Sequence, residues 1–132
     1  KYSYIQGLDQ TNDLDLIFIP ANRWQGSLNY ELASALHLGQ FTFKNLRLQF
    51  NGTYVTKKDN ILFQQDFLLP PGAYYLLGAK FTTDIELGGN LWRIVLDGDN
   101  LLNTAYRDYL NRLRYFSDDL GRNISLGIIF EF

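Results

Sequence analysis

The sequence predicts an all-β fold of about six antiparallel strands, and three observations support this prediction. Apolar and polar residues alternate along most of the chain, which is the pattern of strands with two different faces. Aromatic residues, which favour strands, make up 16% of the 132 residues, and only three Pro interrupt them. No apolar run approaches the roughly 20 residues that a membrane helix requires. The remaining composition, 46% hydrophobic and 20% charged, is that of a folded domain.

Composition also excludes several kinds of function. A net charge of -2 and a pI near 5.2 give no electrostatic reason to expect a nucleic-acid partner. The chain has no Cys, so disulfides and thiolate metal sites are excluded. Its single His, His37, excludes a multi-histidine metal centre and is expected in a turn. Because no Ser-His-Asp spacing is present, we expect neither an enzyme nor a cofactor.

The amino-terminal third predicts a short strand, a long loop and a full strand. Tyr2 and Tyr4 alternate with polar residues, and residues 9–22 form a loop rich in Asp and Asn in which residues 14–18 alternate as a strand extension. A strand begins at Arg23 and has one wholly polar side. Its apolar side carries Trp24, Gly26, Leu28, Tyr30 and Leu32.

The middle of the chain predicts two strands separated by a long loop. The first covers about residues 43–57, and residues 57–72 form the loop, which ends on Pro70-Pro71-Gly72. The second strand resumes near Tyr75 and continues to Leu87. One side of it carries Tyr75, Leu77, Ala79, Phe81, Thr83, Ile85 and Leu87. The apolar side of the preceding strand carries Leu46, Leu48, Phe50, Gly52 and Tyr54.

The carboxyl-terminal third predicts a hairpin, a loop and a last strand. Gly88-Gly89-Asn90 is a tight-turn signal, and a strand with Trp92, Ile94 and Leu96 on one side follows it. The alternation weakens near Gly98, which predicts a bulge. It resumes around Tyr106 before a loop over residues 107–120. The last strand places these residues on one side: Ile124, Leu126, Ile128, Phe130 and Phe132.

The two predicted faces differ in chemistry. The polar face mixes Asn, Gln, Ser, Gly, Arg and Asp, which suits the interior of a large barrel. The apolar face carries aromatic residues near the strand ends and Leu or Ile toward the middle, as in a lipid-facing barrel wall. Periodicity alone leaves two possibilities open: a membrane β-barrel, or a soluble β-sandwich or lipocalin-like barrel that binds a ligand.

Acidic residues of the predicted strands admit a structural explanation. The pairs Asp84 and Glu86, and Asp97 and Asp99, fall on the polar face, where we expect basic residues to neutralise them. The candidates are Lys80 and Arg93. The run Asp97-Gly98-Asp99-Asn100 lacks the Gly and Glu positions of an EF-hand calcium loop, so no metal site is expected there.

The loop at residues 107–122 is the best candidate for ligand contact, because it combines arginines with aromatic residues that together suit anionic groups. The candidate ligand-binding residues are Tyr109, Arg112, Arg114 and Tyr115. The alternative is that acidic residues of the same loop neutralise its arginines. These acidic residues are Asp108, Asp118 and Asp119.

Several motifs resemble one known family. The run Asp-Asn-Leu-Leu-Asn-Thr-Ala-Tyr-Arg-Asp-Tyr-Leu at residues 99–110, then Gly-Arg-Asn-Ile at 121–124 and a terminal Phe, resembles the closing strands of TonB-dependent outer-membrane receptors. Residues 70–79 and 19–23 look like the starts of earlier strands in that family. The resemblance spans essentially residues 1–132 and is most specific from about Ala73 to Phe132.

The resemblance implies a transmembrane β-barrel of 22 strands, of which this chain supplies the last six. Such receptors take up a scarce nutrient, for example a ferric siderophore, haem, cobalamin or glycan, across the outer membrane of Gram-negative bacteria. Loops 9–22, 57–72 and 107–120 would then be extracellular, and Gly88-Gly89-Asn90 periplasmic. The long and short connections in the sequence alternate in the same way.

The resemblance also implies the partners. They are the rest of the barrel and its plug domain, the TonB energy-coupling complex acting through the absent amino-terminal part, outer-membrane lipid and lipopolysaccharide, and the barrel-assembly machinery, which would recognise Phe132. Six strands cannot enclose a polar lumen, and open sheet edges in lipid cost several kcal/mol per unpaired group. We therefore expect the chain to be a fragment or a split subunit of a larger barrel.

Overall fold

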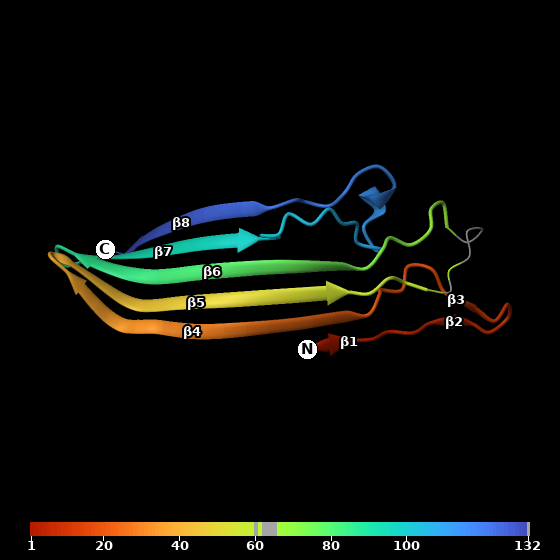
Figure 1. The fold of residues 1–132 in the computed structure, drawn as a ribbon, viewed down its shortest axis with the longest axis horizontal. Coiled ribbons are helices and arrows are strands. Elements are labelled where there is room, and N and C mark those ends of the chain that lie inside the picture. Colours follow the sequence, from red (N-terminus) through yellow and green to blue (C-terminus); the bar gives the residue numbers. More distant parts are fainter. Residues whose placement is uncertain (60, 62–65, 132) are drawn as a thin grey trace.

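The computed structural model describes residues 1–59, 61 and 66–131. It contains an antiparallel sheet of six strands in the order β1-β4-β5-β6-β7-β8, as Figure 1 shows. Their bounds are β1 Tyr2–Ser3, β4 Arg23–Leu38, β5 Phe41–Val55, β6 Tyr74–Leu87, β7 Asn90–Asp99 and β8 Asn123–Glu131. The predicted all-β fold with about six antiparallel strands is confirmed.

The two ends of the sheet differ in their connections (Figure 1). At one end, called here the turn end, two-residue turns at 39–40 and 88–89 join the strands. Gly39, Gly88 and Gly89 have φ angles of 61°, 60° and 82°, a region where a side chain is strained. The other end, called the loop end, carries the long connections 4–22, 56–73 and 100–122.

The described residues of the long connections contain little regular structure. Connection 4–22 forms a second, two-stranded sheet from β2 Leu8–Asp9 and β3 Leu14–Asp15, which lies beyond the loop end rather than over the main sheet (Figure 1). Connection 100–122 contains one 3₁₀ turn, η1, at Arg112–Tyr115. No helix in the described part of the chain is long and apolar enough to cross a membrane.

Strand register fixes which residues share a face. Residues directly opposite each other in neighbouring strands lie on the same side of a sheet. One apolar row runs across five strands through Tyr30, Leu48, Phe81, Leu96 and Leu126. The next row on the other face contains Asn29, Gln49, Lys80, Asp97 and Ser125. The predicted division into an apolar and a polar face is therefore confirmed.

The prediction of a bulge near Gly98 is wrong. Gly98 pairs regularly with Ala79 and Ile124 on its two sides. The alternation weakens there because the chain leaves the sheet after Asp99 and folds back. The side chain of Leu101 then covers Gly98, where an added Cβ would lie 2.7 Å from its Cδ2.

The bulges lie elsewhere, in the two strands nearest the amino-terminal edge. Register shifts occur between Glu31 and Ala33 in β4 and between Lys44 and Arg47 in β5. At the second shift Asn45 has φ 53°, a conformation that Asn tolerates better than most residues. Bulges bend a strand, and the sheet curves as it approaches the turn end (Figure 1).

Two further expectations from the sequence differ from the structure. Strand β4 has 16 residues and is longer than predicted, so His37 lies within the strand rather than in the turn. It pairs with Thr42, and its Nδ1 lies 3.1 Å from the threonine Oγ1. The pattern around Tyr106 belongs to connection 100–122 and not to a strand, because the chain has already left the sheet at Asp99.

The main sheet is a single layer. None of the described side chains falls below 2% exposure, and the buried apolar residues gather near the loop end. They are Val55, Ile61, Tyr74 and Tyr109. Strand β8 has a neighbour on one side only, and β1 covers β4 only at Arg23 and Trp24. The described sheet is thus open at both edges, and its apolar face has no second layer.

Candidate functional site

The polar face of the sheet carries ion pairs between neighbouring strands. Arg93 donates to Asp84 from Nε at 2.7 Å and from a terminal guanidinium nitrogen at 3.3 Å, and Asn45 donates a third hydrogen bond to this carboxylate at 2.8 Å. Lys80 lies 3.3 Å from Asp97. The predicted neutralisation by Lys80 and Arg93 is confirmed for Asp84 and Asp97.

Glu86 is neutralised by a residue that sequence reasoning missed. Lys44 Nζ, from β5, lies 2.6 Å from its carboxylate. Both side chains are 45% exposed, so solvent screens the pair and it contributes little to stability. Its main consequence is electrostatic, because these three ion pairs leave little net charge where they lie on the polar face.

The polar face contains two recesses. The first, called the mid-sheet recess, has a volume of about 550 Å³. Its lining includes charged residues of both signs, and the polar side chains are Asn29, Glu31, Arg47, Gln49, Lys80 and Thr82. Glu31 and Arg47 stand opposite each other on β4 and β5.

The second recess, called the loop-base recess, lies where the polar face meets connection 100–122. Its volume is about 310 Å³, at the lower end of the range of small-molecule sites. Its polar lining residues are mostly uncharged. They are Asn51, Thr53, Asp99, Asn100, Tyr106 and Asn123.

Two asparagines fold the base of connection 100–122. Asn100 is buried, and its side-chain nitrogen donates to the carbonyls of Thr104 at 2.9 Å and Leu120 at 3.3 Å. The Asn103 side-chain oxygen accepts from the backbone of Arg122 at 2.9 Å. Both asparagines have left-handed φ angles, 47° and 54°. The Asn-Leu-Leu-Asn run therefore forms a turn that ties the two ends of this connection together.

Asp108 joins connection 100–122 to the strands. Its carboxylate lies 2.7 Å from Arg23, the first residue of β4, and accepts a hydrogen bond of 2.8 Å from the Tyr74 hydroxyl, at the start of β6. The backbone of Asp108 donates to Asp119 at 2.7 Å, and Asn111 donates to the same carboxylate at 2.6 Å. These bonds fix the connection over the loop end of the sheet.

Asp66, Tyr109, Arg114 and Tyr115 form a buried cluster, called here the loop clasp. The Arg114 guanidinium donates to the Asp66 carboxylate, and both side chains are 2% exposed. The Tyr115 hydroxyl donates to the same carboxylate at 2.5 Å. Carbon Cζ of Arg114 lies 4.9 Å from the ring centre of Tyr109 and 4.4 Å from that of Tyr115. A cation between two rings is a stabilising arrangement.

The clasp changes the acidity of its tyrosines. Burial raises the pKa of the Tyr109 hydroxyl above its ordinary value, because the charged form loses its hydration. The hydrogen bond that Tyr115 donates to Asp66 raises the pKa of Tyr115, because it stabilises the neutral form. Both hydroxyls therefore stay protonated at neutral pH.

The structure brings together three of the four predicted ligand-binding residues. Tyr109, Arg114 and Tyr115 meet in the clasp, where Tyr109 and Arg114 are buried, while Arg112 is exposed on η1. Their contact with a ligand stays a prediction. Phe132, the expected assembly signal, lies outside the described residues.

The arginines of this loop are neutralised in part as the alternative predicted. Arg107 lies 2.5 Å from Asp118 within the loop. Asp108 instead pairs with Arg23, and Arg114 pairs with Asp66 from connection 56–73. Sequence reasoning missed Asp66 because its partner lies in a different connection. The only signal was a lone carboxylate in front of the apolar run 67–69.

No family model, curated protein or solved structure matches this chain. Among the described residues, no group of three or more His, Asp or Glu side chains is arranged to hold a metal ion. The apolar face, the mid-sheet and loop-base recesses and the connections at the loop end are the surface features considered for a function.

Proposed function

We propose that the chain forms part of the wall of an outer-membrane β-barrel that acts as a receptor for the active uptake of a scarce nutrient. The observation that carries this proposal is the uncovered apolar face, which lies between two rows of aromatic side chains. We propose no covalent chemistry for the chain.

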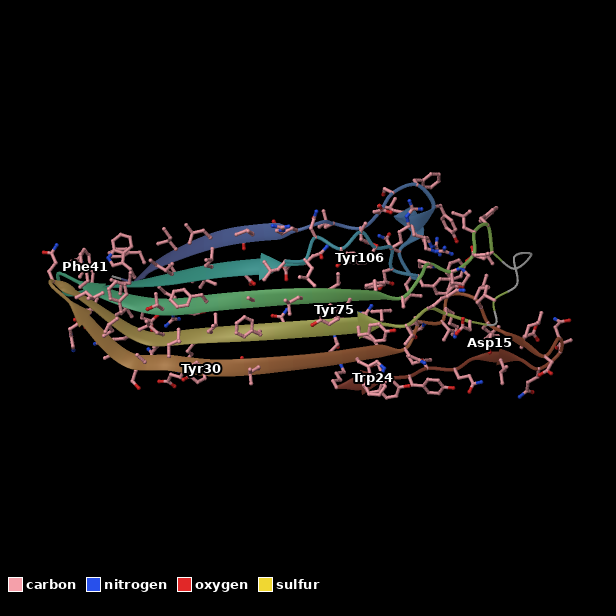
Figure 2. All side chains as sticks on the ribbon, viewed as in Figure 1. Asp15, Trp24, Tyr30, Phe41, Tyr75 and Tyr106 are labelled. Carbon is pink, nitrogen blue, oxygen red and sulfur yellow. The ribbon has the colours of Figure 1, made fainter. Side chains whose placement is uncertain are left out.

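The aromatic rows cross several strands. Near the loop end, Tyr2, Trp24, Tyr54 and Tyr75 stand side by side in register. The rings of Tyr2 and Trp24 have centres 4.2 Å apart. Figure 2 shows Trp24 and Tyr75 near this end and Phe41 at the turn end. The row near the turn end contains three aromatic residues and one aliphatic residue: Phe43, Trp92 and Phe130, with Ile85 between Phe43 and Trp92.

The spacing of the rows suits a bilayer. Tyr75 and Ile85 mark the two rows on β6 and lie ten residues apart. At about 3.3 Å per residue this separation is roughly 33 Å along the strand. A tilt of about 40°, usual for barrel strands, reduces it to a height of roughly 25 Å. That height equals the apolar band of outer-membrane barrels, about 25 Å.

Most large side chains between the rows are aliphatic, Tyr30, Phe50 and Phe81 being the aromatic ones, and many of them are exposed. Leu28 is 67% exposed, Leu126 65% and Ile128 60%. A soluble monomer rarely exposes a continuous apolar patch larger than a few hundred Å². Hydrocarbon tails are the solvent that these side chains suit, whereas a soluble β-sandwich needs a second layer over this face. The described residues provide no such layer, so we do not favour the sandwich.

The open edges support a larger assembly. An unpaired backbone group in lipid costs several kcal/mol, and β8 offers a whole strand of them. Six strands are too few to surround a polar lumen. We therefore propose that the remaining strands of a barrel, with a plug domain inside, complete the wall. Energy would come from the TonB complex acting on the plug, and the assembly machinery would recognise Phe132.

The long connections support a receptor role. Three of them gather at the loop end, and two-residue turns close the opposite end. In outer-membrane barrels the long loops face outward and the short turns face the periplasm. Together with the family resemblance, this asymmetry favours capture of a siderophore, haem, cobalamin or glycan at the loop end, beside lipopolysaccharide.

Cysteine labelling in intact cells tests this orientation, since the chain has no Cys of its own. Phe116→Cys places a thiol at an exposed position of the loop end, and Gln40→Cys places one in a turn at the other end. A membrane-impermeant maleimide is expected to label Phe116→Cys in intact cells and Gln40→Cys only after lysis. Equal labelling of both variants, or recovery of the protein outside the membrane fraction, would contradict the proposal.

A further inference from the structure

We propose that the loop-base recess binds a neutral, hydroxyl-rich ligand of the sugar class. This inference rests on the proposed function in that the ligand would be the captured nutrient, and it deepens that function by naming the chemical class. It depends on four features of the recess: its polar groups, its aromatic wall, its fixed floor and its low charge.

The polar groups suit hydroxyls. Asn51 and Asn123 each offer a donor and an acceptor, Thr53 offers a hydroxyl that does both, and Asp99 accepts only. A sugar hydroxyl also donates and accepts, so it can satisfy amides and a carboxylate at the same time. A ligand without hydroxyls would leave these groups without partners and lose their hydration.

The aromatic wall is Tyr106. Its ring packs against the ring of Tyr74, with centres 4.7 Å apart, and this contact holds it beside the polar face. Figure 2 shows Tyr106 beyond the loop end of β7. An aromatic ring offers an apolar surface on which the C–H face of a sugar ring can pack. Amides, a carboxylate and an aromatic ring together match both kinds of surface on a sugar.

The floor of the recess is fixed by close packing. The side chain of Asn51 lies over Gly78, so that a Cβ added at Gly78 would clash with the side-chain amide nitrogen of Asn51. At the rim, Asn100 ties Thr104 to Leu120. Groups that are already held in place lose little conformational freedom on binding, which favours affinity.

The charge of the recess distinguishes among ligand classes. Its lining contains no Lys or Arg, and Asp99 is its single charged residue. Two arginines of the loop end are paired with carboxylates, Arg23 with Asp108 and Arg107 with Asp118, and Arg122 lies next to the lining residues Gly121 and Asn123 but is not itself in the lining. An anionic ligand would therefore meet one carboxylate and no cation in the recess.

Saturation-transfer NMR on the purified protein in detergent micelles tests the inference. The probes are glucose, galactose and mannose, with glucose 6-phosphate as the anionic and glucosamine as the cationic analogue of glucose. At least one neutral hexose is expected to bind, and glucose 6-phosphate is not.

Variants locate the binding site. Tyr106→Leu keeps apolar bulk against Tyr74 but removes the flat ring, and it is expected to weaken hexose binding about fivefold, as for loss of one aromatic stacking contact. Asn51→Ala is expected to weaken it as well. Glu31→Gln, in the mid-sheet recess, is the matched control and is expected to leave binding unchanged.

Three results would overturn the inference: no hexose binds, only a charged analogue binds, or hexose binding is insensitive to Tyr106→Leu and Asn51→Ala. These results are distinct from failure of the proposed function. Hexose binding by a protein that does not reside in a membrane would support the inference that the loop-base recess binds a sugar, and it would contradict the proposed role in uptake.

Discussion

Arg114 and Asp66 form a buried ion pair between two connections of the loop end, although they are 48 residues apart in the chain. Both side chains are 2% exposed. Asp66 also accepts from Tyr115, and the Arg114 guanidinium lies over the ring of Tyr109. The pair therefore links connection 56–73 to connection 100–122 through one desolvated carboxylate.

Removal of one partner of this pair is expected to open the loop end. Asp66→Ala leaves the Arg114 guanidinium buried without its carboxylate, and loss of one partner of a buried pair costs about 3–5 kcal/mol. Limited proteolysis should then cut connections 56–73 and 100–122 much faster, while the sheet keeps its circular dichroism. Arg112→Ala, at an exposed arginine of the same 3₁₀ turn, is the control and should change little. Equal protection of Asp66→Ala and the unmodified protein would refute the clasp.

Alkaline pH is expected to loosen the clasp. The pKa values of Tyr109 and Tyr115 are raised in the folded protein above the ordinary value of about 10. The folded state therefore keeps its protons longer than the unfolded state. Stability is complete below pH 10 and falls as the pH rises through the folded pKa values.

Absorbance at 295 nm, which reports tyrosinate, measures this titration. A fraction of the nine tyrosines should ionise later than the rest, and protease sensitivity of the loop end should rise over the same pH range. Tyr115→Phe removes one late-ionising group and serves as the matched variant. Simultaneous ionisation of every tyrosine near pH 10 would contradict the prediction.

Gly78 and Gly127 are expected to respond differently to the same substitution. An added Cβ at Gly78 meets the Asn51 amide and the carbonyl oxygen of Gly98 at 3.1 Å, so Gly78→Ala should cost about 1–3 kcal/mol through overpacking. At Gly127 on the same face, the nearest atoms lie 3.8 Å away, which is ordinary contact. Urea unfolding in micelles should show Gly127→Ala to be neutral or slightly stabilising. The reverse order would be incompatible with the described register.

Two neighbouring residues of β8 allow the cost of a charge on the apolar face to be compared with its cost on the polar face. Leu126 lies on the apolar face about halfway between the aromatic rows, and Ser125 lies on the polar face. Leu126→Arg should destabilise the protein in lipid by about 2–4 kcal/mol, as a charge at the bilayer midplane does. Ser125→Arg should change stability by less than about 0.5 kcal/mol, as expected of solvated positions. Folding yields in vesicles of stated thickness measure both, and equal tolerance would contradict a lipid-facing surface.

Alternation along the strands predicted more of the fold than of the site. A period of two assigns each residue to a face, and the Gly88-Gly89-Asn90 signal placed the turn before β7, so β4 to β8 were all predicted. The bulge at Asn45 was not predicted, because a strand has an extra residue only relative to the strand it pairs with, and the sequence does not show that pairing. Near Gly98 the alternation weakened for another reason, because the chain leaves the sheet after Asp99.

The loop end was predictable in composition but not in its contacts. The sequence marked Tyr109, Arg114 and Tyr115 as a group, and η1 does bring two of them together. The carboxylate that joins them belongs to Asp66, which lies 48 residues before Arg114 in a different connection. Only the folded sheet brings these two residues together. The loop-base recess likewise combines β5, β6 and the start of β8, so no local motif signals it.

Depth-dependent quenching of Trp24 and Trp92 by brominated phospholipids is the most direct measurement, because these two residues are the only tryptophans and each lies in one aromatic row. Trp24→Phe and Trp92→Phe isolate the two signals, and Leu126→Trp in a background without both reports the middle of the band. We predict that Trp24 and Trp92 are quenched most by bromines near the headgroups, and that the single indole of the Leu126→Trp variant is quenched most by bromines deep in the chains. Absence of quenching at all three positions would contradict a sheet that faces lipid.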